Sequence, residues 1–139
     1  MTVTMTLEEE NRILRVTFIS PWTADEMVRN FPQAKQWYDD ATHPIHMLID
    51  MRQNRYAPPG ALRAREAPGL THPKAGIAAV FGASTLIRML GEVVMRVARS
   101  ENLKFFDTEA LALAYLRGVI AAEHPQPATP LSEAEKSPV

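Results

Sequence analysis

The side chains best suited to chemistry follow the central apolar run of the sequence. Asp50 ends the run at 45–49, and Arg52 and Arg55 come next. A carboxylate at the end of a buried strand serves as a general base, orients an arginine or a ligand, or accepts hydrogen bonds in a structural role. The sequence offers no matching acid or nucleophile beside Asp50. We therefore predict a protein that is not an enzyme and has no catalytic residue.

Arg52 and Arg55 belong to a basic segment at 51–74. This segment holds five basic residues and one acidic residue, a net charge of +4, whereas residues 1–50 carry a net charge of -4. The planar guanidinium group suits carboxylates and phosphates, and ligands of parallel sheets bind outside the carboxyl ends of the strands. Two interpretations stay open. The segment covers an anionic ligand, or its arginines are solvated or pair with the acidic N-terminal half.

A second candidate site is Gly82-Ala83-Ser84-Thr85, between an apolar run at 77–81 and the strongest helical pattern of the chain. The free N–H groups at a helix start bind anions, and the hydroxyls of Ser84 and Thr85 would add donors. The simpler interpretation is a tight turn at Gly82 and a helix cap at Ser84. The two candidate sites would reinforce each other only if they share one crevice.

Known catalytic and cofactor-binding patterns are missing from the sequence. The residues at 82–86 begin like the nucleophile elbow of hydrolases, but Leu86 replaces the required second glycine and the next histidine is His124. There is no phosphate-binding Gly-Lys loop, dinucleotide glycine pattern or zinc-protease His-Glu pair. His43 and His46 lie on a loop and a strand start that need not turn them to one face. We predict no metal and no cofactor.

The composition excludes several classes of protein. The chain has 139 residues, no cysteine, 46% hydrophobic residues and a formal net charge of -1. Without cysteine there is no disulfide, thiolate metal site or cysteine nucleophile, and the near-neutral charge argues against binding to nucleic acid. No apolar run reaches the roughly 18 residues of a transmembrane segment, and the N-terminus lacks a signal-peptide pattern. The expected location is the cytoplasm.

Hydrophobic periodicity and turn residues predict an alternation of strands and helices. The predicted strands cover 3–7, 13–19, 45–49, 77–81 and 103–106. The predicted helices cover 23–40, 61–67, 86–97 and a last segment that begins at Asp107 or Thr108 and runs through Val119. Pro32 is expected to break the first helix near Phe31. The third helix shows an apolar face made of Leu86, Leu90, Val93 and Val97, with Ile87 and Val94 on the same side.

This order of elements indicates the fold class. A polar turn at 8–11 joins the first two strands into an antiparallel hairpin, and strands then alternate with helices. We predict an α/β domain at 1–123, with a mixed, mostly parallel sheet opened by the hairpin and helices packed on the sheet. The Pro-rich tail at 124–139 is predicted to be disordered.

Four segments resemble a known family. They are Ile13-Leu14-Arg15-Val16, Met47-Leu48-Ile49-Asp50-Met51-Arg52, Gly76-Ile77-Ala78-Ala79-Val80-Phe81-Gly82 and Leu103-Lys104-Phe105-Phe106-Asp107. Over about 3–118 the chain resembles the SpoIIAA-like proteins of the STAS type, which are related in fold to the Sec14/CRAL-TRIO lipid-binding domains. Antagonists of anti-sigma factors in this family are phosphorylated on a serine after the strand-ending aspartate. Here Met51-Arg52-Gln53-Asn54 follows Asp50, and no serine or threonine appears before Thr71.

Two functions follow from these observations. The first is a regulatory or interaction module of the STAS type without the phosphorylatable serine, which contacts a protein partner through the basic segment. The alternative is a protein that binds an anionic or lipid-like small molecule between 52–74 and the helix that starts at Ser84. The expected ligand-binding residues are Asp50, Arg52, Arg55, Gly82, Ser84 and Thr85. The first strand is expected to form a sheet edge, which allows a homodimer.

Overall fold

The computed structural model describes residues 2–123, whose strands form one mixed sheet. The strands are β1 (Val3–Glu8), β2 (Ile13–Ile19), β3 (Ile45–Gln53), β4 (Ala75–Phe81) and β5 (Leu103–Phe106), side by side in that order. β1 runs antiparallel to β2, and the other neighbouring strands are parallel. The predicted α/β fold, with a mostly parallel sheet opened by an antiparallel hairpin, is confirmed.

The helices lie between and after these strands. They are α1 (Ala24–Val28), α2 (Phe31–Asp40), the 3-10 helix η1 (Ala61–Glu66), α3 (Pro68–Thr71), α4 (Thr85–Ala98) and α5 (Glu109–Glu123). The break that Pro32 predicts separates α1 from α2, because Pro32 occupies the first turn of α2 and has no N–H to continue a helix. Pro68 ends η1, as expected, but it also begins the short turn α3.

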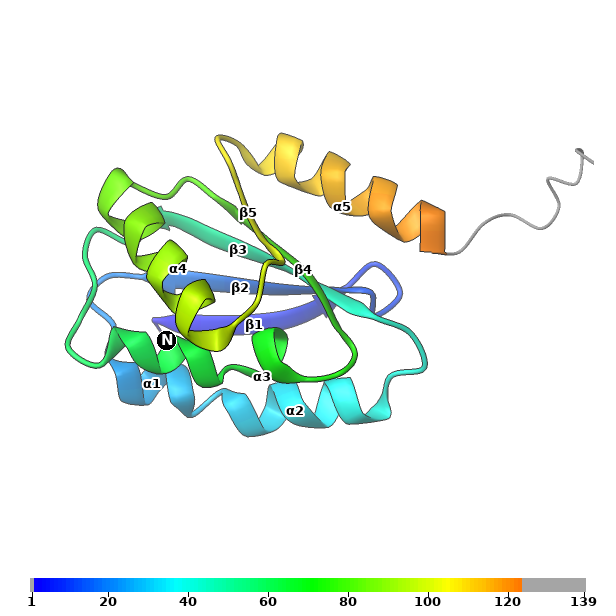
Figure 1. Ribbon diagram of the computed structural model, residues 1–139, viewed down its shortest axis with the longest axis horizontal. Coiled ribbons are helices and arrows are strands. Elements are labelled where there is room, and N and C mark those ends of the chain that lie inside the picture. Colours follow the sequence, from blue (N-terminus) through cyan, green and yellow to red (C-terminus); the bar gives the residue numbers. More distant parts are fainter. Residues whose placement is uncertain (1, 124–139) are drawn as a thin grey trace, which may run out of the picture.

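The helices α1, α2, η1, α3 and α4 lie on one face of the sheet, and α5 lies on the other (Figure 1). The parallel strands β2 to β5 are added in one direction, and crossovers between parallel strands keep a single hand. The crossover segments therefore all lie on the same face. α5 follows the last strand and packs on the opposite face, against β3, β4 and β5.

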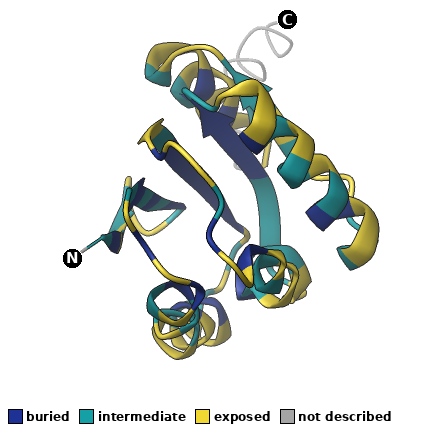
Figure 2. Ribbon diagram, turned by 90° about the vertical axis from the view of Figure 1, so that its left-hand side faces the viewer, coloured by how far each residue is buried: buried dark blue, intermediate teal, exposed yellow. Residues whose placement is uncertain are grey.

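The hydrophobic core has two parts, one on each face of the sheet. The larger part packs Leu14, Val16, Met47, Ile49 and Val80 of the strands against the crossover helices. The smaller part is made of Ile13, Leu48, Ala79 and Phe81 of the strands with Ala112 and Leu116 of α5. The sheet between the two layers is the most buried part of the molecule (Figure 2). Successive side chains of β2, β3 and β4 point to opposite faces of the sheet, so each of these strands contributes to both parts of the core.

The helix α4 faces the sheet with Ile87, Leu90 and Val94 of its predicted apolar face, but not with the two end residues of that face. Ile87, Val94 and Met95 are buried, whereas Leu86 is 57% exposed and Val97 is 52% exposed. A Cβ at Gly91 would lie 2.8 Å from Cζ of Phe105 on β5, so α4 approaches the sheet most closely at this glycine. The close approach at Gly91 turns Leu86 and Val97 away from the core.

Within 2–123, no helix combines the length and the apolar character that crossing a bilayer requires. The predicted disordered tail at 124–139 lies outside the described residues.

Candidate functional site

An apolar cavity of about 150 Å³ lies between the sheet and the crossover helices. Its floor is formed by side chains of all five strands, and its walls come from α1, α2, η1, α3 and α4. Figure 1 shows how these helices surround the same face of the sheet. The cavity is therefore bordered by residues of the segment at 52–74 and of α4.

Small and flexible side chains explain why this space is not filled. Ala61, Ala64 and Ala67 line the cavity from the segment around η1, and Gly91 lines it from α4. These residues have too little volume to reach across to the sheet. Protein interiors hold few spaces larger than a water molecule, so a space of this volume with an apolar lining is a distinctive feature of the domain.

Methionines make much of the remaining lining. Met5, Met27, Met47, Met51 and Met95 all line the cavity. Unbranched thioether side chains adapt to irregular shapes, either as fillers of the core or as contacts to a ligand. Met47 and Met95 are buried, whereas Met89 is 58% exposed and lies outside the lining.

Polar groups in the lining are few. Among the described residues, the lining holds no acidic, basic or histidine side chain, and its amide side chains are those of Asn30 and Asn54. Nδ2 of Asn30 donates to the backbone oxygens of Glu26 at 3.0 Å and Val3 at 3.4 Å. Oδ1 of Asn54 accepts from Nε1 of Trp22 at 2.8 Å. A site without titratable groups favours binding over acid-base chemistry.

Asp50 and Arg52 bind each other on the opposite face of the sheet. Asp50 is 5% exposed, and it accepts from the Arg52 side chain through Nε at 3.0 Å and a terminal nitrogen at 2.8 Å. Burial disfavours the charge of Asp50, but the hydrogen bonds from Arg52 outweigh burial and hold the pKa of Asp50 below its ordinary value. The guanidinium of Arg52 lies 5.0 Å from the centre of the Phe81 ring.

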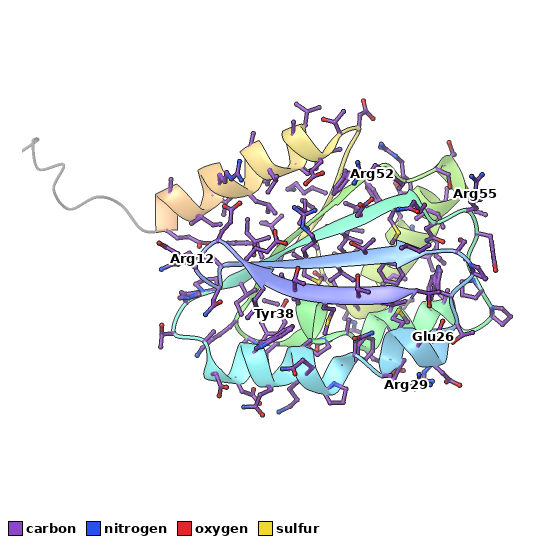
Figure 3. All side chains as sticks on the ribbon, turned by 180° about the vertical axis from the view of Figure 1, so that it is seen from behind. Arg12, Glu26, Arg29, Tyr38, Arg52 and Arg55 are labelled. Carbon is purple, nitrogen blue, oxygen red and sulfur yellow. The ribbon has the colours of Figure 1, made fainter. Side chains whose placement is uncertain are left out.

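A chain of ion pairs extends from this arginine to the start of α5. Arg52 lies 3.7 Å from Glu109, and Arg15 lies 2.9 Å from the same carboxylate and 3.0 Å from Glu8. Figure 3 shows Arg52 beside the beginning of α5 and Arg55 in the loop beyond β3. These contacts attach α5 to β1, β2 and β3, so the guanidinium of Arg52 has a structural partner on each side.

The other predicted site residues lie around the start of α4 and the end of β3. Gly82 has φ +74°, and a Cβ there would lie 2.5 Å from Cγ of Arg52. Ser84 caps α4, because its hydroxyl accepts from the backbone N–H of Ile87 at 3.3 Å. Thr85 and Arg55 are exposed. Gly82 thus leaves room for Arg52, and the capping role expected for Ser84 is confirmed.

These positions do not coincide with the cavity. The cavity lining contains none of the six predicted ligand-binding residues. Asp50, Arg52 and Gly82 lie close together, on the side of the sheet that α5 covers. Anion binding by the six residues stays a prediction. Sequence reasoning missed the cavity itself, although the small residues at 61–69 and the methionines are a weak signal of it.

Two further polar residues with buried groups, His46 and Tyr38, lie outside both the cavity lining and the pair of Asp50 and Arg52. His46 is 1% exposed; its Nδ1 accepts from the backbone N–H of Ile77 at 2.8 Å, so its Nε2 donates to Glu123 at 2.9 Å. The hydroxyl of Tyr38 is buried without a hydrogen-bond partner among the described residues, and burial raises the pKa of Tyr38. Figure 3 shows Tyr38 between α2 and the sheet. No group of three metal-binding side chains occurs within 2–123.

Comparisons with protein-family models, with curated proteins and with solved structures found no match. The resemblance to the STAS type therefore stays an expectation from the sequence, and the function is argued from the geometry.

Proposed function

We propose that this protein binds a small apolar or lipid-like molecule in the cavity between the sheet and α4. The observation that supports this proposal is the apolar cavity of about 150 Å³ between the sheet and the helices. An apolar ligand that occupies this space removes apolar surface of the lining from water, which favours binding. Because the ligand binds only the folded protein, it also stabilises the fold.

The volume and the lining limit the ligand. An apolar cavity of about 150 Å³ takes up a molecule the size of benzene. A compound with a single ring, or the terminal part of an acyl chain, fits this description. The absence of charged groups from the described lining means that binding depends on apolar contact. The proposal keeps the lipid-like ligand expected from the sequence and moves its site from the arginines to the cavity.

Calorimetric titration with toluene tests this proposal. The unaltered protein is expected to bind toluene, and Ala64→Leu is expected to abolish binding, because Ala64 lines the cavity and a leucine there occupies its space. Ala114→Leu is the matched control, since Ala114 is an exposed residue of α5 on the other face. Absence of toluene binding, or equal binding by both variants, would contradict the proposal.

The interaction module of the STAS type is the second candidate. The observation that favours it is a row of apolar residues that α4 leaves exposed, namely Leu86, Met89 and Val97. Larger exposed apolar surfaces mark contacts with other proteins. If the partner is a second copy of this chain, the unaltered protein is expected to be a dimer in sedimentation velocity. Leu86→Ser together with Val97→Ser is then expected to convert this dimer to a monomer. A monomeric unaltered protein at all concentrations would remove the homodimer form.

A further inference from the structure

Asn54 is a buried amide in the wall of the apolar cavity. It follows the last residue of β3, and only 4% of it is exposed. Trp22 and Met51 line the cavity together with Asn54. This place is at the carboxyl end of the parallel strands, where ligands of open α/β sheets bind.

The neighbours of Asn54 determine which way its amide points. The indole N–H of Trp22 is a donor only, so the atom 2.8 Å from it must be the oxygen of Asn54. The hydroxyl of Ser20 also donates to this oxygen, at 3.2 Å, and accepts from the backbone N–H of Arg55 at 2.9 Å. Both acceptor positions of the oxygen are in use, and Nδ2 is held on the opposite side.

The nitrogen of this amide is poorly satisfied. Nδ2 of Asn54 lies 3.2 Å from the sulfur of Met51, which is a weak acceptor. The second hydrogen of Nδ2 has no acceptor among the hydrogen bonds of the described residues. A buried donor without a good acceptor is unfavourable, and a ligand that supplies an acceptor removes that penalty. In contrast, the amide nitrogen of Asn30 already donates to two backbone oxygens.

We infer that the ligand of the cavity is an apolar molecule with one neutral hydrogen-bond acceptor, such as a ketone or ester carbonyl, and that Nδ2 of Asn54 donates to it. This inference rests on the proposed function. The acceptor is neutral because the described lining has no cationic side chain, and a carboxylate buried there would lack a counter-charge. Asn54 then determines specificity, while the apolar wall supplies most of the affinity.

An isosteric pair of probes tests the inference. Acetophenone and α-methylstyrene have the same skeleton, and a carbonyl oxygen in the first replaces a methylene group in the second. The measured quantity is the ratio of the two association constants. Asn54→Leu is expected to lower this ratio by about tenfold, which corresponds to about 1.4 kcal/mol and to one neutral hydrogen bond.

Met51→Leu provides a second variant, because Asn54→Leu also removes the acceptor of Trp22 and can prevent folding. Replacing the sulfur leaves both hydrogens of Nδ2 without an acceptor, while the contact between Asn54 and Trp22 is kept. The ratio is expected to rise by about threefold, because the carbonyl then satisfies an amide nitrogen that has no other acceptor. Met95→Leu is the matched control, because it makes the same change elsewhere in the lining and should leave the ratio unchanged.

The outcomes separate the two proposals. If α-methylstyrene binds and the ratio is the same in the unaltered protein and the Met51 variant, the role of Asn54 is refuted and the apolar site stands. If neither probe binds the unaltered protein, the proposed function itself is refuted.

Discussion

Filling the cavity should make the protein more stable. Ala64→Leu adds three carbon atoms to a side chain that lines the cavity. At about 0.8 kcal/mol for each buried carbon the gain is about 2.4 kcal/mol, and the lost rotamer freedom of leucine costs about 0.5–1 kcal/mol. We expect the free energy of unfolding to rise by about 1.5 kcal/mol and the melting temperature by about 5 °C.

Denaturation by urea, followed by circular dichroism, measures this change. The midpoint should move to higher urea concentration while the slope of the transition stays the same. Ala114→Leu, on the exposed surface of α5, should change the free energy of unfolding by less than about 0.5 kcal/mol. A loss of stability in Ala64→Leu would show that the leucine meets packed atoms, and the reasoning from the cavity would fail.

Other variants test the remaining contacts. In the unaltered protein the depressed pKa of Asp50 contributes stability that is present above the ordinary aspartate pKa and is lost as the pH falls through the folded pKa. Between pH 6 and pH 2, urea denaturation should therefore show a smaller loss of unfolding free energy for Asp50→Asn than for the unaltered protein. An equal loss in both would refute the pairing with Arg52. Tyr38→Phe removes a buried hydroxyl without a partner in 2–123, so the free energy of unfolding should stay equal or rise by up to about 1 kcal/mol; a clear loss would reveal an acceptor. Ser84→Ala should cost about 1 kcal/mol through loss of the cap, whereas Thr85→Ala should cost much less; equal thermal stabilities would contradict this.

Local patterns were sufficient to predict most elements of the fold. The alternation around Val16 and the continuous apolar run at 45–49 each reflect how many faces of the strand are buried. The helix break near Pro32 and the cap at Ser84 follow from backbone chemistry within a few residues, and the structure confirms both. These features depend on near neighbours in the chain, so a single sequence contains the information.

The candidate site depends on tertiary packing, and the sequence could not predict it. Gly91 determines how α4 lies on the sheet because it touches Phe105, which is distant in the sequence. The cavity forms where small side chains of η1 and α4 face the sheet, and this arrangement depends on contacts between elements distant in the sequence. The sequence does not distinguish Asn54 from other loop residues, because the hydrogen bond from the indole N–H of Trp22 to its oxygen joins residues that are distant in the sequence. The charge pattern of the sequence predicts Arg52 as a ligand-binding residue, but its guanidinium binds Asp50 and does not line the cavity.

Methyl NMR of the methionines tests the central claim most directly. Met5, Met27, Met47, Met51 and Met95 line the cavity, whereas Met89 is exposed and lies outside the lining. Titration of toluene into protein labelled with ¹³C at the methionine methyl groups should shift the signals of the lining methionines and leave that of Met89 in place. Shifts confined to Met89, or no shift at a saturating concentration of toluene, would contradict a ligand site between the sheet and α4.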